Sequence, residues 1–322
     1  MPDKIKWGVL STANIGVEHV IPAMQKGELT EVAAIASRKL ARAEEAAEKL
    51  GLSKAYGSYD ELLDDDEIDA IYNPLPNDQH VPWTIKAIEA GKHVLCEKPI
   101  ALNANEAEKL LAISEKHPHI KVMEAFMYRF HPQWDIVKSW ISVGMIGDIN
   151  SIQSAFTYHN TDPDDFRNHP EMGGGGLLDI GSYCISSARY IFEAEPEKIL
   201  SSVEIDPEFG VDRHASALME FPEGTVSFYC STQSDPIQNM TIYGSEGIIK
   251  FEIPFNPLEK EVTVSLIKDG SVIEKKKVQA NHYTLQGDAF SEAIIEDGPV
   301  PTPLRDAVAN MKVIDQIMKK GR

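Results

Sequence analysis

The sequence predicts an α/β domain with a doubly wound parallel sheet, followed by an α+β domain. Over residues 1–125, short β-rich segments alternate with amphipathic helical segments, which is the pattern of βαβ units. After Phe130 the pattern changes to many short strands joined by tight turns, such as residues 222–224 and 268–270, which is typical of an antiparallel meander. We therefore expect one domain over residues 1–125 and a second over residues 126–322.

The first domain is expected to contain five or six strands and three clear helices. The strand-like runs cover residues 6–10, 31–36, 55–56, 69–73, 93–96 and 121–124. Apolar residues recur at helical spacing over residues 41–50, 78–90 and 103–116. Gly51 and Gly91 end the first two of these helices, because glycine readily adopts the left-handed conformation of a helix C-terminus.

The second domain is expected to begin with a helix over residues 132–143 and to end with two helices. The predicted strands cover residues 149–158, 199–205, 215–221, 225–231, 240–243, 247–252, 262–267 and 271–278. The closing helices are expected at residues 284–296 and 304–319. The sequence shows no internal repeat and no low-complexity linker.

Composition excludes several function classes. A net charge of -19 disfavours nucleic acid and anionic membrane surfaces as partners, because phosphates would be repelled. No apolar run approaches the roughly 18 residues of a membrane span. Three widely spaced cysteines fit a reducing compartment, and we expect a cytoplasmic protein. The histidines show no metal-ligand spacing, so no metal site is predicted.

The first strand leads into a turn that has the pattern of a nucleotide-binding loop. The segment from Gly8 to Gly16 occupies the place of a G-x-G-x-x-G motif, with Ser11 and Ala13 where the first two glycines are usual. Small residues still let backbone N–H groups approach a pyrophosphate at the helix N-terminus. An ordinary strand-to-helix turn is the alternative. The residues expected to contact the cofactor here are Ser11, Thr12, Ala13, Asn14 and Ile15.

The end of the second strand indicates which dinucleotide is bound. NAD-binding units usually carry an acidic residue there, which binds the ribose 2'-hydroxyl. This chain has Ser37 and Arg38 instead, and a hydroxyl with a guanidinium can bind a 2'-phosphate through charge-assisted hydrogen bonds. The sequence therefore predicts NADP, with NAD possible. The alternative is that Arg38 is a solvated residue before a helix.

A rigid loop follows the fourth strand, over residues 73–80. We expect Pro74, Leu75, Asn77 and His80 to lie beside the cofactor, because the loop leaves the carboxyl end of a parallel strand. Pure helix capping is an equally good interpretation of Asn77. His80 has a second interpretation as a surface residue of the next helix.

The tripeptide Glu97-Lys98-Pro99 ends the fifth strand and carries the most information. A lysine at the end of a parallel strand, facing the crevice where a dinucleotide would lie, is placed to move a proton while the cofactor moves a hydride. This combination predicts a dehydrogenase with Lys98 as acid and base. Glu97 is expected to hold the nicotinamide ribose.

Two further segments supply candidate substrate ligands. Tyr128 and Arg129 lie where the last parallel strand leads into the second domain, and such side chains suit a polyhydroxylated ring. Packing at the domain boundary is the alternative. Asp179 and Tyr183 lie four residues apart on one helical face, where they can orient a substrate hydroxyl and share a proton with Lys98. A helix-dipole acid and a half-buried tyrosine are the structural alternative.

These segments together resemble the Gfo/Idh/MocA family of NAD(P)-dependent sugar and cyclitol oxidoreductases. The motifs E-K-P, P-L-P-N-x-x-H, E-A-F-M-Y-R-F-H-P and G-G-G-x-L-x-D-I-G-x-Y carry the resemblance over essentially the whole chain. Within the family the chain is most similar to the branch of D-xylose dehydrogenases and dimeric dihydrodiol dehydrogenases. The resemblance implies a Rossmann domain, a C-terminal domain built on a large open mostly antiparallel sheet, and catalysis by Lys98 with Asp179 and Tyr183.

The expected activity is hydride transfer between NADP and a sugar or related vicinal diol. Inositol dehydrogenases have a histidine in place of Tyr183, so cyclitol substrates are disfavoured. Two alternatives within the family are an NAD-dependent glycosidase that oxidises its sugar transiently and a non-catalytic NADP-sensing regulator. A homodimer or higher homo-oligomer joined through the open face of the C-terminal sheet is also expected, because a large exposed apolar sheet face is normally an interface.

Overall fold

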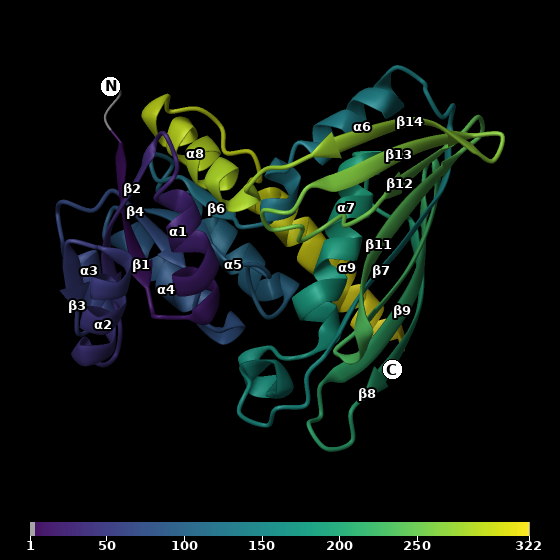
Figure 1. The fold of residues 1–322 in the computed structure, drawn as a ribbon. Coiled ribbons are helices and arrows are strands. Elements are labelled where there is room, and N and C mark those ends of the chain that lie inside the picture. The colour runs from purple at the N-terminus through teal and green to yellow at the C-terminus, as the bar shows by residue number, and fades with distance from the viewer. Residues whose placement is uncertain (1–3, 322) are drawn as a thin grey trace. The chain divides into compact units, whose positions relative to one another are not determined.

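The computed structural model describes residues 4–321 and divides into two compact units (Figure 1). The first unit comprises residues Met1–Met127 and Asn281–Val308, and the second comprises Tyr128–Ala280 and Ala309–Arg322. Within the described residues, no helix combines the length and the apolar character that crossing a membrane requires.

The first unit is built on a six-stranded parallel sheet, as the sequence predicts. The strands are β1 (Ile5–Leu10), β2 (Thr30–Ala36), β3 (Lys54–Tyr56), β4 (Ala70–Asn73), β5 (His93–Cys96) and β6 (Val122–Glu124). Their order is β3-β2-β1-β4-β5-β6, so the direction of winding reverses between β1 and β4. Ligands of such sheets bind outside the carboxyl ends of the strands at that reversal point.

Helices flank this sheet, and each expected helix is present with small shifts at its ends. They are η1 (Gly16–Val20), α1 (Ile21–Met24), α2 (Leu40–Leu50), α3 (Tyr59–Leu63), α4 (Asn77–Glu89) and α5 (Ala104–Ser114). All four residues of β4 are buried, as expected for a central strand covered on both faces. Gly51 and Gly91 have the positive φ angles of 68° and 77° expected where helices end.

The division at residue 125 differs from the compact units of the structure. Helix α8 (His282–Ile295) belongs to the first unit, although it follows the whole second sheet in the sequence. The indole Nε1 of Trp7 in β1 donates to Ser291 Oγ at 3.2 Å, and the Trp7 and Phe290 rings lie 5.6 Å apart. The Asp288 carboxylate also accepts the backbone N–H groups of residues 28 and 29. Contacts with β1 and with residues 28 and 29 therefore place helix α8 in the first unit.

The second unit is built on an eight-stranded, mostly antiparallel sheet. The strands are β7 (Ile149–His159), β8 (Lys198–Ile205), β9 (Asp212–Phe221), β10 (Gly224–Ser231), β11 (Gln233–Gly244), β12 (Ile248–Phe251), β13 (Val262–Lys268) and β14 (Ser271–Val278). Their order is β14-β13-β12-β11-β7-β10-β9-β8. The sheet is not a simple meander, because β7 lies between β10 and β11 and pairs with β10 in parallel.

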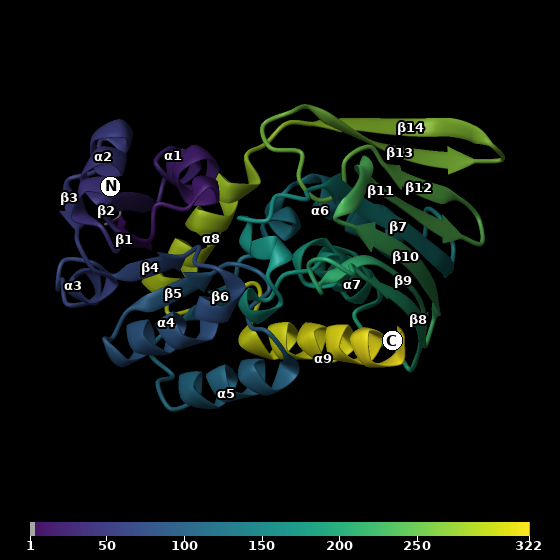
Figure 2. The same cartoon turned by 90° about the horizontal axis from the view of Figure 1, so that it is seen from below.

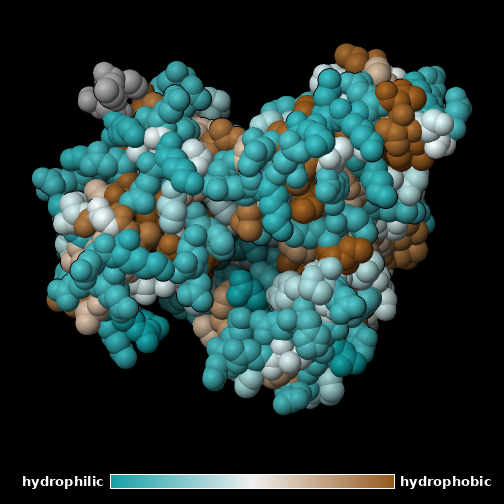
Figure 3. Space-filling view, in the orientation of Figure 1, coloured by the Kyte–Doolittle hydropathy of each residue, from teal (hydrophilic) through white to brown (hydrophobic). Residues whose placement is uncertain are grey.

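The helical segments between and after these strands are η2 (Met127–Phe130), α6 (Gln133–Ser142), η3 (Phe166–Asn168), η4 (Pro170–Met172), η5 (Leu177–Gly181), α7 (Ser182–Phe192) and α9 (Leu304–Gly321). Of these, α6, α7 and α9 lie over one face of the second sheet (Figure 2). Side chains along the strands therefore alternate between the covered face and the exposed face. In β10, Val226, Phe228 and Cys230 are buried, whereas Tyr229 is 37% exposed. Hydrophobic surface also lies over the outer end of the β13–β14 hairpin (Figure 3), where Val272 and Ile273 are exposed.

Candidate active site

The turn after β1 is tight and leads directly into a helix. Ser11 has a φ of 74°, in the left-handed region that favours glycine, and so adopts the conformation of the glycine it replaces. Its Oγ accepts a hydrogen bond from the Ala13 N–H at 3.2 Å. A helix begins directly afterwards, with Val17 N–H bonded to the Ala13 carbonyl. Thr12 and Ile15 are half-buried and Asn14 is exposed. The loop therefore fits a pyrophosphate at a helix N-terminus.

The end of β2 presents a hydroxyl and a guanidinium. Ser37 is buried, and its Oγ accepts the Lys39 N–H at 3.4 Å. Arg38 is exposed but anchored, because its guanidinium is hydrogen-bonded to the Tyr59 side chain in α3. Burial raises the pKa of Tyr59, and the Arg38 charge offsets part of that rise. Tyr59 is thus a hydrogen-bond partner of Arg38 that the sequence alone does not reveal.

The loop after β4 is fixed by its first residue. The buried Asn73 side chain donates to Thr84 Oγ1 and to the His80 carbonyl, both at 3.2 Å, and accepts the Leu75 N–H at 3.3 Å. Pro74, Leu75 and Asn77 are buried. Helix α4 begins at Asn77 with Pro76 as its N-cap residue, so Asn77 is not the capping side chain.

His80 lies at the centre of this region and is only 1% exposed. Its Nδ1 lies 2.7 Å from the Pro99 carbonyl oxygen, and its Nε2 lies 2.7 Å from the Leu75 carbonyl oxygen. Burial lowers the pKa of His80 to about 4. The charge of Lys98 also lowers this pKa, whereas the hydrogen bonds to the two carbonyl groups raise it. The interpretation of His80 as a surface residue is wrong, because the ring is buried between the loop and the segment that follows Lys98.

His80 should make stability depend on pH. The unfolded chain binds a proton at this residue near pH 6.5, whereas the folded protein binds it only near pH 4. The stabilisation is therefore complete above about pH 6.5 and is lost as the pH falls toward 4, by up to about 3 kcal/mol. Urea unfolding of the wild type and of His80→Gln across this window should give free-energy curves that converge at low pH. Parallel curves would contradict the assignment.

Glu97 and Lys98 follow β5, one strand from the reversal point of the sheet. The Tyr72 hydroxyl donates to Glu97 Oε1 at 2.7 Å, and the Lys98 backbone N–H donates to Glu97 Oε2 at 3.3 Å. Burial, followed by the Glu97 charge, raises the pKa of Tyr72 well above its ordinary value, so this phenol stays a donor. Lys98 is half-buried. The buried Glu124 carboxylate accepts the Ile100 N–H at 2.8 Å and holds the segment that follows.

In the second unit, four consecutive glycines lead into the helix that carries Asp179 and Tyr183. Asp212 Oδ2 accepts the Leu177 N–H at 2.6 Å and so holds the start of η5. A Cβ on Gly175, whose φ is 114°, would lie 2.1 Å from Asp212 Oδ1. A Cβ on Gly174 would lie 2.4 Å from the Arg167 carbonyl oxygen. The glycine run is therefore required for close approach of the loop to β9 and η3.

Asp179 is 8% exposed and belongs to a polar cluster. Its Oδ2 accepts hydrogen bonds from the Tyr158 hydroxyl at 2.6 Å and from Arg167 Nε at 3.1 Å. Tyr183 lies one turn further along, 5% exposed, among aromatic rings. Its ring centroid is 5.5 Å from that of Phe156 and 5.7 Å from that of Phe255. Asp179 also lies in the first turn of η5, as the alternative of a helix-dipole acid expects.

Tyr128 and Arg129 occupy a buried network of the same unit. Tyr128 is fully buried, and its hydroxyl lies 2.9 Å from Ser186 Oγ. Arg129 Nε donates to the Tyr128 hydroxyl at 3.2 Å, and Nη2 donates to Ser186 Oγ at 2.8 Å. These contacts give Tyr128 a packing role. Direct substrate contact by Tyr128 or Arg129 stays a prediction.

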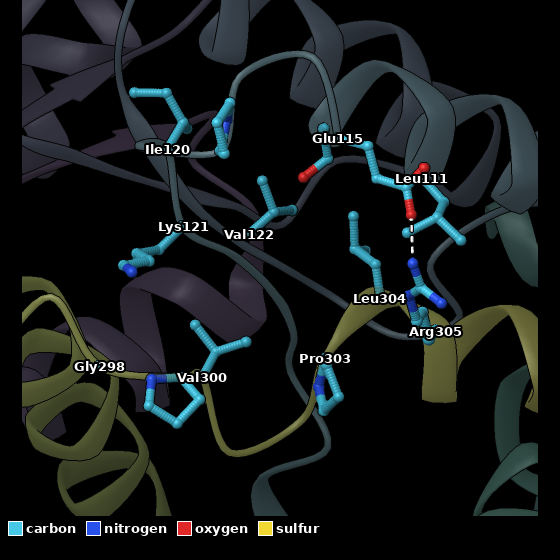
Figure 4. A pocket seen from close by; sticks show the side chains of 13 residues that line it. Leu111, Glu115, Ile120, Lys121, Val122, Gly298, Val300, Pro303, Leu304 and Arg305 are labelled. Carbon is cyan, nitrogen blue, oxygen red and sulfur yellow. Dashed lines mark hydrogen bonds and ion pairs between the residues drawn. The ribbon is translucent and has the colours of Figure 1, made fainter.

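A separate groove of about 510 Å³ lies elsewhere on the first unit. It is bounded by α5, the start of β6 and the loop before α9, with Leu111, Val122, Val300 and Leu304 among its lining residues (Figure 4). An ion pair between Glu115 and Arg305 lies at one side. None of the residues that the sequence predicts for the active site lines this groove.

Comparison with known proteins agrees with this arrangement. The family model described as an oxidoreductase family with an NAD-binding Rossmann fold matches residues 5–126, and the Gfo/Idh/MocA C-terminal domain model matches residues 134–250. The chain belongs to the Gfo/Idh/MocA family of oxidoreductases.

Relatives of this Gfo/Idh/MocA protein include enzymes of both expected kinds. It is 36% identical to D-xylose 1-dehydrogenase (NADP(+)) 2 of Haloferax volcanii, over 98% of this chain and 97% of that protein. It is 33% identical to trans-1,2-dihydrobenzene-1,2-diol dehydrogenase of Mus musculus, over 79% and 77%. The crystal structure of the 3-ketoreductase KijD10 of Actinomadura kijaniata, with NADP and TDP-benzene, matches with a TM-score of 0.90 and 29% identity, over 99% and 98% of the two chains.

Sequence reasoning missed the residues that hold the candidate ligands in place. Tyr59, Tyr72, Tyr158, Arg167 and Asp212 each bond a predicted site residue or the start of its helix. None of them lies in the motifs that the family resemblance rests on. The one available signal was position, since Tyr72 is in β4 and Tyr158 near the end of β7.

Proposed function

We propose that this protein is an NADP-dependent oxidoreductase that transfers a hydride between nicotinamide and a sugar or related vicinal diol. The observation that carries the proposal is the position of Lys98, two residues after the end of β5 and one strand from the reversal point of a six-stranded parallel sheet. A proton carrier at that edge lies where this fold binds its ligand. Relatives of the chain that act on D-xylose and on a dihydrodiol support the substrate class.

The residues at the end of β2 fit NADP. No carboxylate follows β2, where an acidic residue would repel a 2'-phosphate, and the chain offers the Ser37 hydroxyl and the anchored Arg38 guanidinium. The loop over residues 11–15 and its helix N-terminus fit the pyrophosphate. The cofactor would supply or accept the hydride, and the protein would hold it through these groups and Glu97. Pro74, Leu75, Asn77 and His80 complete the proposed cofactor-binding set.

Each proposed catalytic residue has a separate task. Lys98 donates or accepts the proton on the substrate oxygen at its Nζ, and Glu97, held by Tyr72, keeps the lysine segment in place. Asp179 and Tyr183 orient substrate hydroxyls.

Arg38→Ala should weaken NADP binding and leave NAD binding nearly unchanged. The loss of a hydrogen bond to a charged group corresponds to roughly 1.5 to 3 kcal/mol. Titration calorimetry with both cofactors measures the difference. Lys39→Ala is the matched control, because Lys39 is an exposed cation next in the sequence. Equal losses for both cofactors in Arg38→Ala would show that Arg38 does not bind the phosphate.

We also propose that two copies associate through the uncovered face of the second sheet. Leu200, Leu218 and Tyr229 are 55%, 40% and 37% exposed on β8, β9 and β10. Leu200 pairs with Leu218 across the strands, so their side chains adjoin. Light scattering should give twice the chain mass of 35.7 kDa. We propose a cytoplasmic location as well, because three widely spaced cysteines fit a reducing compartment.

Leu218→Glu should convert this dimer to a monomer, because it places a charge in the buried face. Val143→Glu is the control, since Val143 is 69% exposed and lies in the turn after α6. A monomeric wild type at micromolar concentration would contradict the proposal. So would a Leu218→Glu protein that remained a dimer.

A further inference from the structure

The polar cluster around Asp179 brings three separate segments together. Tyr158 comes from β7, Arg167 from η3 and Asp179 from η5, and the two donors meet on the same carboxylate oxygen, Oδ2. Arg167 is itself held, because Asp165 Oδ1 lies 3.4 Å from its Nη1 and accepts its backbone N–H at 2.9 Å. Asn160 Nδ2 in turn donates to Asp165 Oδ2 at 2.8 Å. The guanidinium therefore has a defined place beside Asp179.

The backbone of Arg167 is fixed by the glycine run. The Gly175 N–H donates to the Arg167 carbonyl oxygen at 2.9 Å, and Gly174 packs so close that a Cβ would collide with that oxygen. The loop that starts the Asp179 helix is thus the same loop that anchors Arg167. Because one loop holds both segments, the Arg167 guanidinium and the Asp179 carboxylate keep a fixed distance from each other.

The charges in the cluster have defined signs. Asp179 raises the pKa of Arg167, against burial, which lowers it, so the guanidinium remains cationic. Burial raises the pKa of Tyr158, and Asp179 raises it further, so the phenol remains protonated. Burial raises the pKa of the Cys230 thiol well above its ordinary value, and the charges of Asp212 and Asp179 add smaller contributions, so the thiol stays neutral. The Arg167 guanidinium and the Tyr158 hydroxyl therefore both remain hydrogen-bond donors to Asp179 Oδ2.

We infer that Arg167 and Tyr158 are positioning residues that hold Asp179 as a hydrogen-bond acceptor for a substrate hydroxyl group, and that Asp179 does not carry a proton during turnover. The inference rests on the proposed function and narrows its substrate class. The substrate must then present a hydroxyl donor to Asp179, and the proton is carried by another of the proposed catalytic residues.

Arg167→Gln tests this inference, because glutamine keeps a hydrogen-bond donor but removes the charge. With the best substrate of the wild type, KM should rise roughly 10-fold and the acid limb of kcat/KM should move upward by about one pH unit. Arg167→Lys should restore the acid limb, and NADP affinity should be unchanged in both variants. Tyr158→Phe should also raise KM, but the acid limb of kcat/KM should shift less than in Arg167→Gln. A substrate analogue that lacks the hydroxyl bound by Asp179 should react equally well with wild type and with Arg167→Gln.

Arg305→Gln is the control, because it removes an exposed arginine ion pair outside the cluster. An Arg167→Gln enzyme with an unchanged acid limb and unchanged KM would overturn the inference. A wild type inactive on every sugar and diol would instead refute the proposed function. In that case nuclear magnetic resonance still tests the inference. The carboxyl carbon signal of Asp179, assigned by its loss in Asp179→Asn, is followed as the pH changes. It should titrate at higher pH in Arg167→Gln than in wild type, and equal titration would overturn the inference.

Discussion

Lys98→Met should lower kcat by at least about 100-fold, the lower end of the effect of general acid-base catalysis. Methionine keeps the length and the apolar stem of lysine but cannot carry a proton. Cofactor affinity should change little, because the Glu97 carboxylate is held by the Tyr72 hydroxyl and by backbone groups, which the substitution leaves intact. Steady-state kinetics and calorimetry with NADP measure the two effects separately.

Lys86→Met is the matched control for Lys98→Met, since Lys86 is a surface lysine of α4 whose side chain is 48% exposed. Its turnover should equal that of wild type. Near-normal turnover in Lys98→Met would assign the proton transfer to another group. Tyr183→Phe then becomes the deciding variant, because it removes the phenol and keeps the aromatic packing with Phe156 and Phe255.

Gly175→Ala should destabilise the protein by at least about 3 kcal/mol and abolish activity. The new Cβ would lie 2.1 Å from Asp212 Oδ1, and Asp212 is the residue that holds the Leu177 N–H. The φ of 114° adds strain for any residue with a side chain. Urea denaturation followed by fluorescence gives the change in the free energy of unfolding.

Gly270→Ala separates the two causes of that loss. Gly270 has a φ of 72°, but a Cβ there would meet nothing within 4 Å. It should therefore cost only the left-handed strain, about 1 to 2 kcal/mol. Equal destabilisation by the two substitutions would show that the contact with Asp212 contributes nothing.

Local sequence patterns predict the first sheet well because parallel strands are buried on both faces and separated by amphipathic helices. The strands at residues 69–73 and 93–96 agree closely with β4 and β5. The placement of Asp179 and Tyr183 on one helix also follows from local spacing. Such features depend on residues that are neighbours in the chain.

Features that depend on distant residues could not be predicted in the same way. The parallel pairing of β7 with β10 needs the whole segment between them to cross over, which no strand signal encodes. Helix α8 joins the first unit through the hydrogen bond between Trp7 and Ser291, which lie 284 positions apart in the chain. The bonds from Tyr158 and Arg167 to Asp179 likewise link segments that share no motif. His80 lies in helix α4, and its position in the sequence gives no sign that its ring is buried.

The most direct test of the central claim is the absorbance of the reduced nicotinamide when the wild type is mixed with NADP and a panel of aldoses, dihydrodiols and cyclitols. The account predicts that at least one aldose or vicinal diol reduces NADP in multiple turnovers, that cyclitols react poorly, and that Lys98→Met loses the signal. Cofactor that stays bound and is never consumed while a glycoside is cleaved would contradict it, and so would the absence of reduction or oxidation with every substrate.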